Sequence, residues 1–143
     1  MASYNKKEHL RANIEAIKTV FALHREQRTA TPEERTVLEA YTGFGALKCI
    51  LSPANTMEDI ARWNKSELEL FPVVMELHRT IRDNTTSESQ YKSYMQSLKN
   101  SVMTAFYTPA PVVREIAASL REAGIVPKRI LDPSAGMGEF IRS

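Results

Sequence analysis

Apolar residues recur every three or four positions near the start of the chain, as they do on one face of a helix. They are Leu10, Ile14, Ile17 and Phe21, with Val20 and Leu23 widening the stripe. This pattern predicts an amphipathic helix over residues 5–28. A second helix is predicted from 32 to about 41, because Thr31-Pro32-Glu33-Glu34 provides an N-cap, a proline at the first helical position and an acid three residues after the cap.

The middle of the chain alternates breakers with further helical segments. Thr56 with Asp59 predicts a helical segment that carries Trp63, and Ser66 with Glu69 predicts a helix cap. Pro72 is too deep for that helix, because proline cannot donate to the carbonyl of residue 68. We therefore expect a kink or restart near Pro72, followed by a helix through Val74, Leu77, His78 and Ile81. Ser87 with Gln90 begins another helix, whose inner stripe is Tyr91, Tyr94, Met95, Leu98 and Val102.

The last part of the chain changes character. After an extended Phe106–Pro109 segment, a helix is predicted on the stripe Val112, Val113, Ile116, Ala117 and Leu120, with Gly124 at its C-terminal end. Pro127 prevents its continuation, and Arg129-Ile130-Leu131 is short and apolar, as a buried parallel strand is. The pattern predicts a mainly α chain, with a helical domain over residues 1–104 and the first helix–strand unit of a second domain over 105–143.

Composition agrees with a folded globular protein, since 43% of the residues are apolar and 25% are charged. The net charge of +2 does not by itself indicate nucleic-acid binding. The single Cys49 cannot form an internal disulfide, and no signal-peptide pattern is present, so we expect a cytoplasmic, reducing environment. No apolar run approaches the roughly 20 residues that span a bilayer, so no membrane partner is expected.

The candidate chemistry follows the predicted strand. In Asp132-Pro133-Ser134-Ala135-Gly136-Met137-Gly138, the two glycines allow the backbone to approach a ligand closely. Glu139 stands where a phosphate loop requires lysine, and Ile141 stands where a dinucleotide loop requires a third glycine or alanine. A cofactor with a positively charged amino and sulfonium group suits this acidic loop better than a pyrophosphate does.

The segment Asp132–Phe140 resembles the cofactor motif of N6-adenine DNA methyltransferases. In that family a Phe/Tyr-Tyr/Phe-Thr-Pro segment and a short helix precede the loop at a similar distance, as Phe106-Tyr107-Thr108-Pro109 does here. Tyr41-Thr42-Gly43-Phe44-Gly45-Ala46-Leu47 also resembles a Tyr-x-Gly-Phe/Trp-Gly-Gly-Leu segment of methylase-helicase proteins of phages and mobile elements. Ala46 replaces the third glycine of that pattern.

This resemblance implies a Rossmann-like fold after the helical domain, S-adenosylmethionine as cofactor and DNA as partner of the full-length protein. Asp132 would orient bound water or the methionine amino group, Gly136 and Gly138 would line the methionine moiety, and Thr108 would touch its carboxylate. The implied cofactor-binding residues are Phe106, Tyr107, Thr108, Pro109, Asp132, Pro133, Ser134, Ala135, Gly136, Gly138 and Phe140.

The family's catalytic Asn/Asp-Pro-Pro-Tyr/Phe tetrapeptide does not occur in this sequence. The resemblance therefore implies an N-terminal fragment that is inactive by itself and contains no catalytic residue. The alternative is a noncatalytic helical module that binds DNA or a protein.

Other candidate residues are predicted to be structural. Gly43-Phe44-Gly45 is expected to form a helix C-cap with an aromatic ring packed under it. Trp63, Tyr91, Tyr94 and Cys49 are expected in the core. No metal site is predicted, because His9, His24 and His78 lack ligand spacing.

Overall fold

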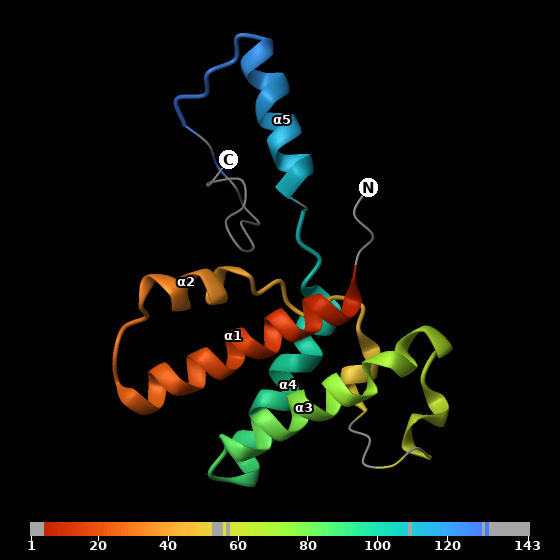
Figure 1. Ribbon diagram of the computed structural model, residues 1–143. Coiled ribbons are helices and arrows are strands. Elements are labelled where there is room, and N and C mark those ends of the chain that lie inside the picture. The colour runs from red at the N-terminus through yellow and green to blue at the C-terminus, as the bar shows by residue number, and fades with distance from the viewer. Residues whose placement is uncertain (1–4, 53–55, 57, 109, 130, 132–143) are drawn as a thin grey trace. The chain divides into compact units, whose positions relative to one another are not determined.

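The computed structural model describes residues 5–52, 56, 58–108, 110–129 and 131. The chain forms two compact units, Met1–Ala105 and Phe106–Ser143. The first contains α1 (Lys6–Glu26), α2 (Pro32–Glu39), α3 (Phe71–Asp83), α4 (Glu88–Thr104) and three short 3₁₀ helices, η1 (Lys48–Leu51), η2 (Asp59–Arg62) and η3 (Lys65–Leu70); the second contains α5 (Ala110–Glu122) (Figure 1). Within the described residues there is no strand, and the predicted mainly α class is confirmed.

The first two helices form a hairpin whose ends are fixed by local hydrogen bonds. The Asn5 side chain accepts from the amides of Lys7 and Glu8 and so begins α1. Thr31 and Glu34 form the predicted capping box at the start of α2. Both predicted helices are confirmed, and α2 lies alongside α1 (Figure 1).

An ion-pair cluster closes the connection between these two helices. Arg28 Nη1 and Nη2 donate to the two carboxylate oxygens of Glu34 at 2.6 and 2.7 Å, and Arg28 Nε donates to Glu26 at 2.6 Å. The hydrogen bond from Arg28 lowers the pKa of the Glu34 carboxyl to about 2. The same carboxylate therefore serves both the capping box and the turn.

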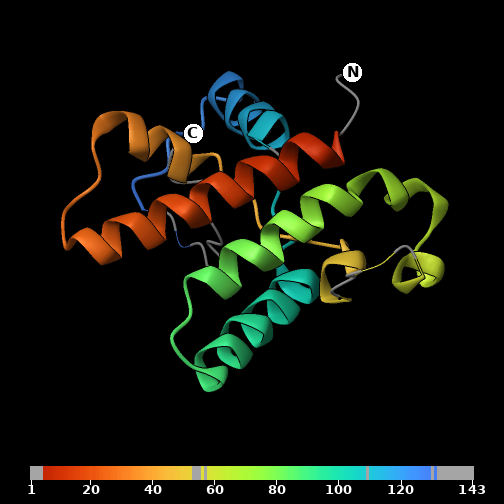
Figure 2. The same ribbon diagram turned by 60° about the horizontal axis from the view of Figure 1, so that its bottom comes forward.

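The core of the first unit is built around α3, which lies between α1 and α4 (Figure 2). Val74 and Leu77 on α3 have no exposed surface. The buried cluster contains Leu10, Ile14, Phe44, Leu47, Cys49, Ile50, Leu70, Val73, Val74, Leu77, Ile81, Leu98 and Val102. Residues from α1, α3, α4 and the segment after α2 thus share one core.

Pro72 determines where α3 begins. The chain runs as η3 up to Leu70 and then changes to an α-helix at Phe71, so Pro72 lies in the first turn, where its missing N–H requires no partner. The predicted restart is confirmed. The predicted cap at Ser66 is wrong, because Ser66 lies inside η3 and the N-cap residue is Asn64. The helical segment predicted from Thr56 and Asp59 is the short 3₁₀ helix η2, and Trp63 is its C-cap residue.

His78 is a polar residue within this core. Its Nε2 atom lies 2.8 Å from the carbonyl oxygen of Ile50, whereas its Nδ1 atom is buried without a hydrogen-bond partner. Burial lowers the pKa of His78 below its ordinary value of 6.5, and the hydrogen bond to Ile50 offsets only part of this effect. The folded state therefore favours neutral His78.

We predict that the first unit loses stability as the pH falls below 6.5. Unfolded His78 gains a proton near that pH, whereas folded His78 resists it, so this contribution is present above pH 6.5 and is lost as the pH falls toward the folded-state pKa. Denaturant midpoints measured at neutral and at mildly acidic pH check this. His78→Gln should reduce the pH-dependent loss, and His24→Gln, at an exposed position of α1, should not; equal losses in the wild type and His78→Gln would contradict it.

Candidate functional site

The segment Phe106–Thr108, which the family resemblance places at one wall of the cofactor pocket and which we call the aromatic wall, is the first segment of the second unit. Phe106, Tyr107 and Thr108 lie between α4 and α5 without regular structure, and all three are exposed. The exposed fractions of Phe106 and Tyr107 are 66% and 41%. The remaining predicted cofactor residues, Pro109, Asp132, Pro133, Ser134, Ala135, Gly136, Gly138 and Phe140, lie outside the described residues.

The helix that follows this wall has an apolar face that is only partly covered. Val113 is buried, but Val112, Ile116 and Leu120, which are spaced four residues apart, remain between 38% and 48% exposed. Leu131, in the segment predicted as a strand, is 88% exposed. Arg129 and Leu131 are not in a strand, and Ile130 lies outside the described residues. A row of exposed aliphatic side chains of this kind marks a surface suited to further packing.

The C-terminal end of α5 has the predicted glycine geometry. The amide of Gly124 donates to the carbonyl of Arg121 at 3.0 Å, and the amide of Ile125 donates to that of Leu120 at 2.9 Å. Gly124 has a φ of 71°, which glycine adopts without steric cost. These two bonds form a Schellman motif, so the chain turns sharply at this glycine.

The Tyr41–Leu47 turn enters the core of the first unit. Phe44 is buried, and its ring meets that of Tyr41 edge to face with the centroids 6.0 Å apart. Asn13 of α1 is completely buried beside the turn: its Oδ1 accepts from the amide of Thr42 at 2.8 Å, and its Nδ2 donates to the carbonyl of Gly43 at 2.5 Å. The turn is thus attached to α1 through one side chain.

The same turn is also bonded to the C-terminal end of α4. The Phe44 amide donates to Ser101 Oγ at 3.1 Å, and the Ala46 amide donates to the Val102 carbonyl at 3.1 Å. Gly43 and Ala46 both have left-handed backbone conformations, with φ values of 75° and 63°. Ala46 therefore keeps a conformation that glycine adopts more easily.

The predicted role of Gly43-Phe44-Gly45 is half right. Phe44 packs in the core as expected, but the turn is not the C-cap of α2. That cap is Ala40, which is in the right-handed conformation. The turn follows the end of α2, and its backbone groups form hydrogen bonds with α1 and α4.

Sequence reasoning missed Asn13 as an important residue. The sequence does indicate that Asn13 is buried. It lies three positions after Leu10 and four before Ile17, and therefore falls on the apolar face of α1. A buried amide at such a position requires hydrogen-bond partners. The pattern could not identify those partners, which lie 29 and 30 residues further along the chain.

The other candidate residues of the first unit are structural. Cys49 is buried as predicted, and burial raises the pKa of its thiol to about 11, which keeps it protonated and unreactive at neutral pH. Trp63 and Tyr94 pack as predicted against the core, with ring partners Phe71 and Phe21 at centroid distances of 6.1 and 5.5 Å. Tyr91 also packs there and lies under the Arg82 guanidinium, 3.5 Å from its ring centroid.

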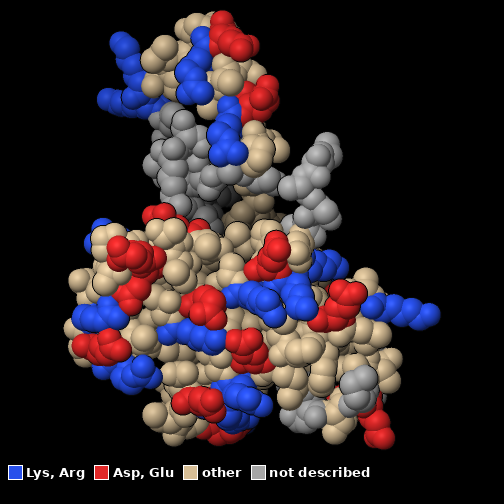
Figure 3. Space-filling view, in the orientation of Figure 1, with Lys and Arg blue, Asp and Glu red and all other residues tan. Residues whose placement is uncertain are grey.

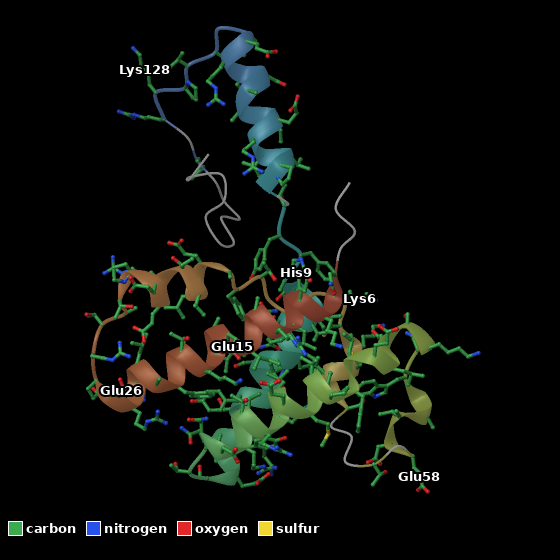
Figure 4. The ribbon with its side chains drawn as sticks, in the orientation of Figure 1. Lys6, His9, Glu15, Glu26, Glu58 and Lys128 are labelled. Atoms are coloured by element: carbon green, nitrogen blue, oxygen red, sulfur yellow. The ribbon has the colours of Figure 1, made fainter. Side chains whose placement is uncertain are left out.

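Among the described residues of the first unit, no charged cluster forms an evident binding site. Lys and Arg alternate with Asp and Glu over the face of this unit seen in Figure 3. His9, labelled in Figure 4, has its Nδ1 atom 3.3 Å from Thr42 Oγ1. In the part of the chain that the structure describes, no three His, Cys, Asp or Glu side chains are grouped so that they could bind a metal ion.

An open depression of about 400 Å³ lies between the beginning of α1 and η3. Both signs of charge line it, from Lys6, Lys7, Glu8 and Glu69. The Asn5 side chain at its edge is already bonded to α1 backbone amides. The depression therefore has no excess of one charge with which to select a ligand.

No protein-family model, curated protein or solved structure matches this chain. Among the described helices, none has the length and apolar character needed to cross a membrane.

We predict that Ala46→Gly stabilises the first unit by about 0.5–1 kcal/mol. The left-handed conformation costs an L-residue roughly 1–2 kcal/mol, and the greater freedom of glycine in the unfolded chain offsets part of the gain. Denaturant titration measures the free energy of unfolding. Ala22→Gly, inside α1, is the matched control and should destabilise by up to about 1 kcal/mol. Equal destabilisation by the two substitutions would contradict the strain at Ala46.

Proposed function

We propose that this chain is the N-terminal part of an S-adenosylmethionine-dependent DNA adenine N6-methyltransferase and contributes part of its cofactor site. The observation that carries the proposal is the order of two segments, Phe106–Pro109 and Asp132–Phe140, with a helix between them. The complete protein would methylate the exocyclic amino nitrogen of adenine. The catalytic tetrapeptide is not in this sequence, so the chain by itself is inactive.

The division of the chain supports this proposal. The second unit begins at Phe106, so a unit boundary directly precedes the aromatic wall. Helix α5 lies between this wall and the glycine loop, Asp132–Gly138, in sequence and ends in a sharp turn at Gly124. The family resemblance expects a short helix between these two segments, and α5 occupies that place in the sequence.

The partly exposed apolar face of α5 supports a Rossmann-like fold for the second domain. In a Rossmann-like domain, a helix beside a parallel sheet covers that sheet with its apolar side. Val112, Ile116 and Leu120 form such a side, and they remain partly exposed. We propose that α5 and residues 129–131 are the first helix–strand unit of this fold, with further strands completing the core.

The chemistry of the available side chains fits the cofactor. The exposed rings of Phe106 and Tyr107 offer apolar surface for it to pack on, and the exposed Thr108 hydroxyl can donate to a carboxylate. Asp132 supplies a negative charge for a positively charged amino group, and Gly136 leaves room for close backbone approach. S-adenosylmethionine, when bound, supplies the activated methyl group.

Calorimetric titration of S-adenosylmethionine into the purified chain tests the proposal. We predict measurable binding, and we predict that Asp132→Asn weakens it about tenfold or more, because a hydrogen bond to a charged group contributes about 1.5–3 kcal/mol. Asp83→Asn, the same change at the exposed end of α3, should leave the affinity unchanged. Absence of heat at millimolar cofactor would refute the proposal.

Duplex DNA provides a second measurement. If the chain is instead a DNA-binding module, it should bind duplex DNA without cofactor, and this binding should fall steeply as salt is raised. Such binding, together with no response to S-adenosylmethionine, would favour the noncatalytic alternative.

A further inference from the structure

Helix α4 has a broad exposed side at the edge of the first unit (Figure 2). The buried residues of this helix lie on the opposite side, toward the core. Spacings of three, four and seven residues place Lys92, Gln96 and Lys99 on one face of the helix, beside Ser93 and Asn100. All five side chains are exposed, and we call this set the α4 polar face.

The α4 polar face carries positive charge and no carboxylate. Residues 89–104 include Lys92 and Lys99 but neither Asp nor Glu. The acid that begins the helix, Glu88, is paired with Arg82 at 2.9 Å. Neither lysine has an ion-pair partner among the described residues. The two lysines lie roughly 10 Å apart along the helix axis, so their charge is extended along the face, as suits a polyanion.

The other long helix of this unit exposes charges of both signs. On α1, Lys7 and Arg11 are exposed together with Glu8 and Glu15. In contrast, the element that packs against the end of α4 adds positive charge, because Lys48 of η1 is exposed. The lack of acids is therefore a property of α4 and its neighbour η1, and not of the whole surface.

The two amide side chains of the α4 polar face are bonded to each other. Gln96 Nε2 donates to Asn100 Oδ1 at 2.9 Å. These side chains have no other partner among the described residues, so Gln96 Oε1 remains as an acceptor and Asn100 Nδ2 as a donor. In the major groove of DNA, adenine presents an acceptor at N7 and a donor at N6, which such a pair complements.

We propose that the α4 polar face binds duplex DNA in the major groove, with Lys92 and Lys99 on phosphate groups and the two amides toward base edges. The dimensions agree, because an α-helix is about 10–12 Å across and the major groove of B-DNA is about 12 Å wide. The inference deepens the proposed function. It rests on that function only for the role of this binding, which is to hold the substrate of methyl transfer.

Other partners fit this face less well. Met103 is the one large apolar side chain that is exposed on the described part of α4. A protein interface has a buried apolar centre, and a membrane-binding helix has a continuous apolar face, so the α4 polar face suits neither. The major groove of duplex RNA is too deep and narrow for side chains to read. Charge and shape together therefore favour duplex DNA.

The salt dependence of duplex DNA binding by the purified chain tests the inference. Each lysine that neutralises a phosphate contributes about 0.9 to the slope of log K against log salt concentration. We expect Lys92→Gln combined with Lys99→Gln to reduce this slope by about two and to weaken binding about tenfold or more at low salt. Arg35→Gln combined with Lys65→Gln removes the same charge from exposed positions on α2 and η3, and should leave the slope nearly unchanged.

A change of charge without a change of shape provides a second variant. Asn100→Asp places a carboxylate on the α4 polar face and should weaken DNA binding, because the carboxylate repels phosphate groups. Asn5→Asp adds the same charge at the N-cap of α1, where Asp caps a helix as well as Asn does, and should leave DNA binding nearly unchanged. All the substituted side chains are exposed, so every variant should remain folded, which circular dichroism checks.

The inference is overturned if the two double variants show equal slopes, or if duplex RNA of the same sequence binds as tightly as the DNA. Absence of binding to duplex DNA at low salt would also overturn it. None of these measurements uses S-adenosylmethionine. A chain that binds DNA through α4 but gives no heat with the cofactor would therefore keep this inference and lose the proposed function, so the two failures are distinguishable.

Discussion

The packing of the first unit depends on hydrogen bonds to the backbone around Phe44, which is buried together with its side chain. A buried ring brings its own backbone and that of its neighbours inside, and each N–H and C=O there requires a partner. Asn13, Ser101 and the Val102 carbonyl supply these partners from two different helices. The need to bond one short turn thus determines how α1 and α4 are placed around α3.

Charged groups contribute less to this arrangement. Lys18 of α1 lies 2.6 Å from Glu76 of α3 and 2.8 Å from Glu15, but all three side chains are substantially exposed. Exposed pairs of this kind contribute about 0–1 kcal/mol, because water and salt screen them. The ion pairs of Arg28 and Arg82 likewise lie beside the connections that follow α1 and α3. The apolar cluster and the buried hydrogen bonds therefore determine the packing, and the ion pairs join neighbouring elements at the surface.

Much of the helical structure could be predicted, because its determinants are local. The Thr31 and Ser87 caps, the restart at Pro72 and the glycine after α5 each depend on residues within a few positions. The short 3₁₀ helices could not be distinguished from longer helices, since both share the same caps and breakers. The contacts of Asn13 and the conformation of Ala46 could not be predicted either, because their partners are distant in sequence. In the candidate site, motif spacing predicted a role for Phe106–Thr108 from the sequence, whereas their exposure depends on tertiary structure.

The bonds between the Tyr41–Leu47 turn and α4 have a topological consequence. Phe44 and Ser101 are 57 residues apart, and all of η1, η2, η3 and α3 lies between them. The two ends of this stretch therefore lie next to each other, as the two ends of an inserted domain do. Loop-closure entropy rises only slowly with loop length, so a stretch with joined ends can lengthen or shorten at its surface at little cost. Helix α1, the turn and the end of α4 thus form a frame around this stretch, and the connections at its surface can change in length while α3 keeps its place in the core.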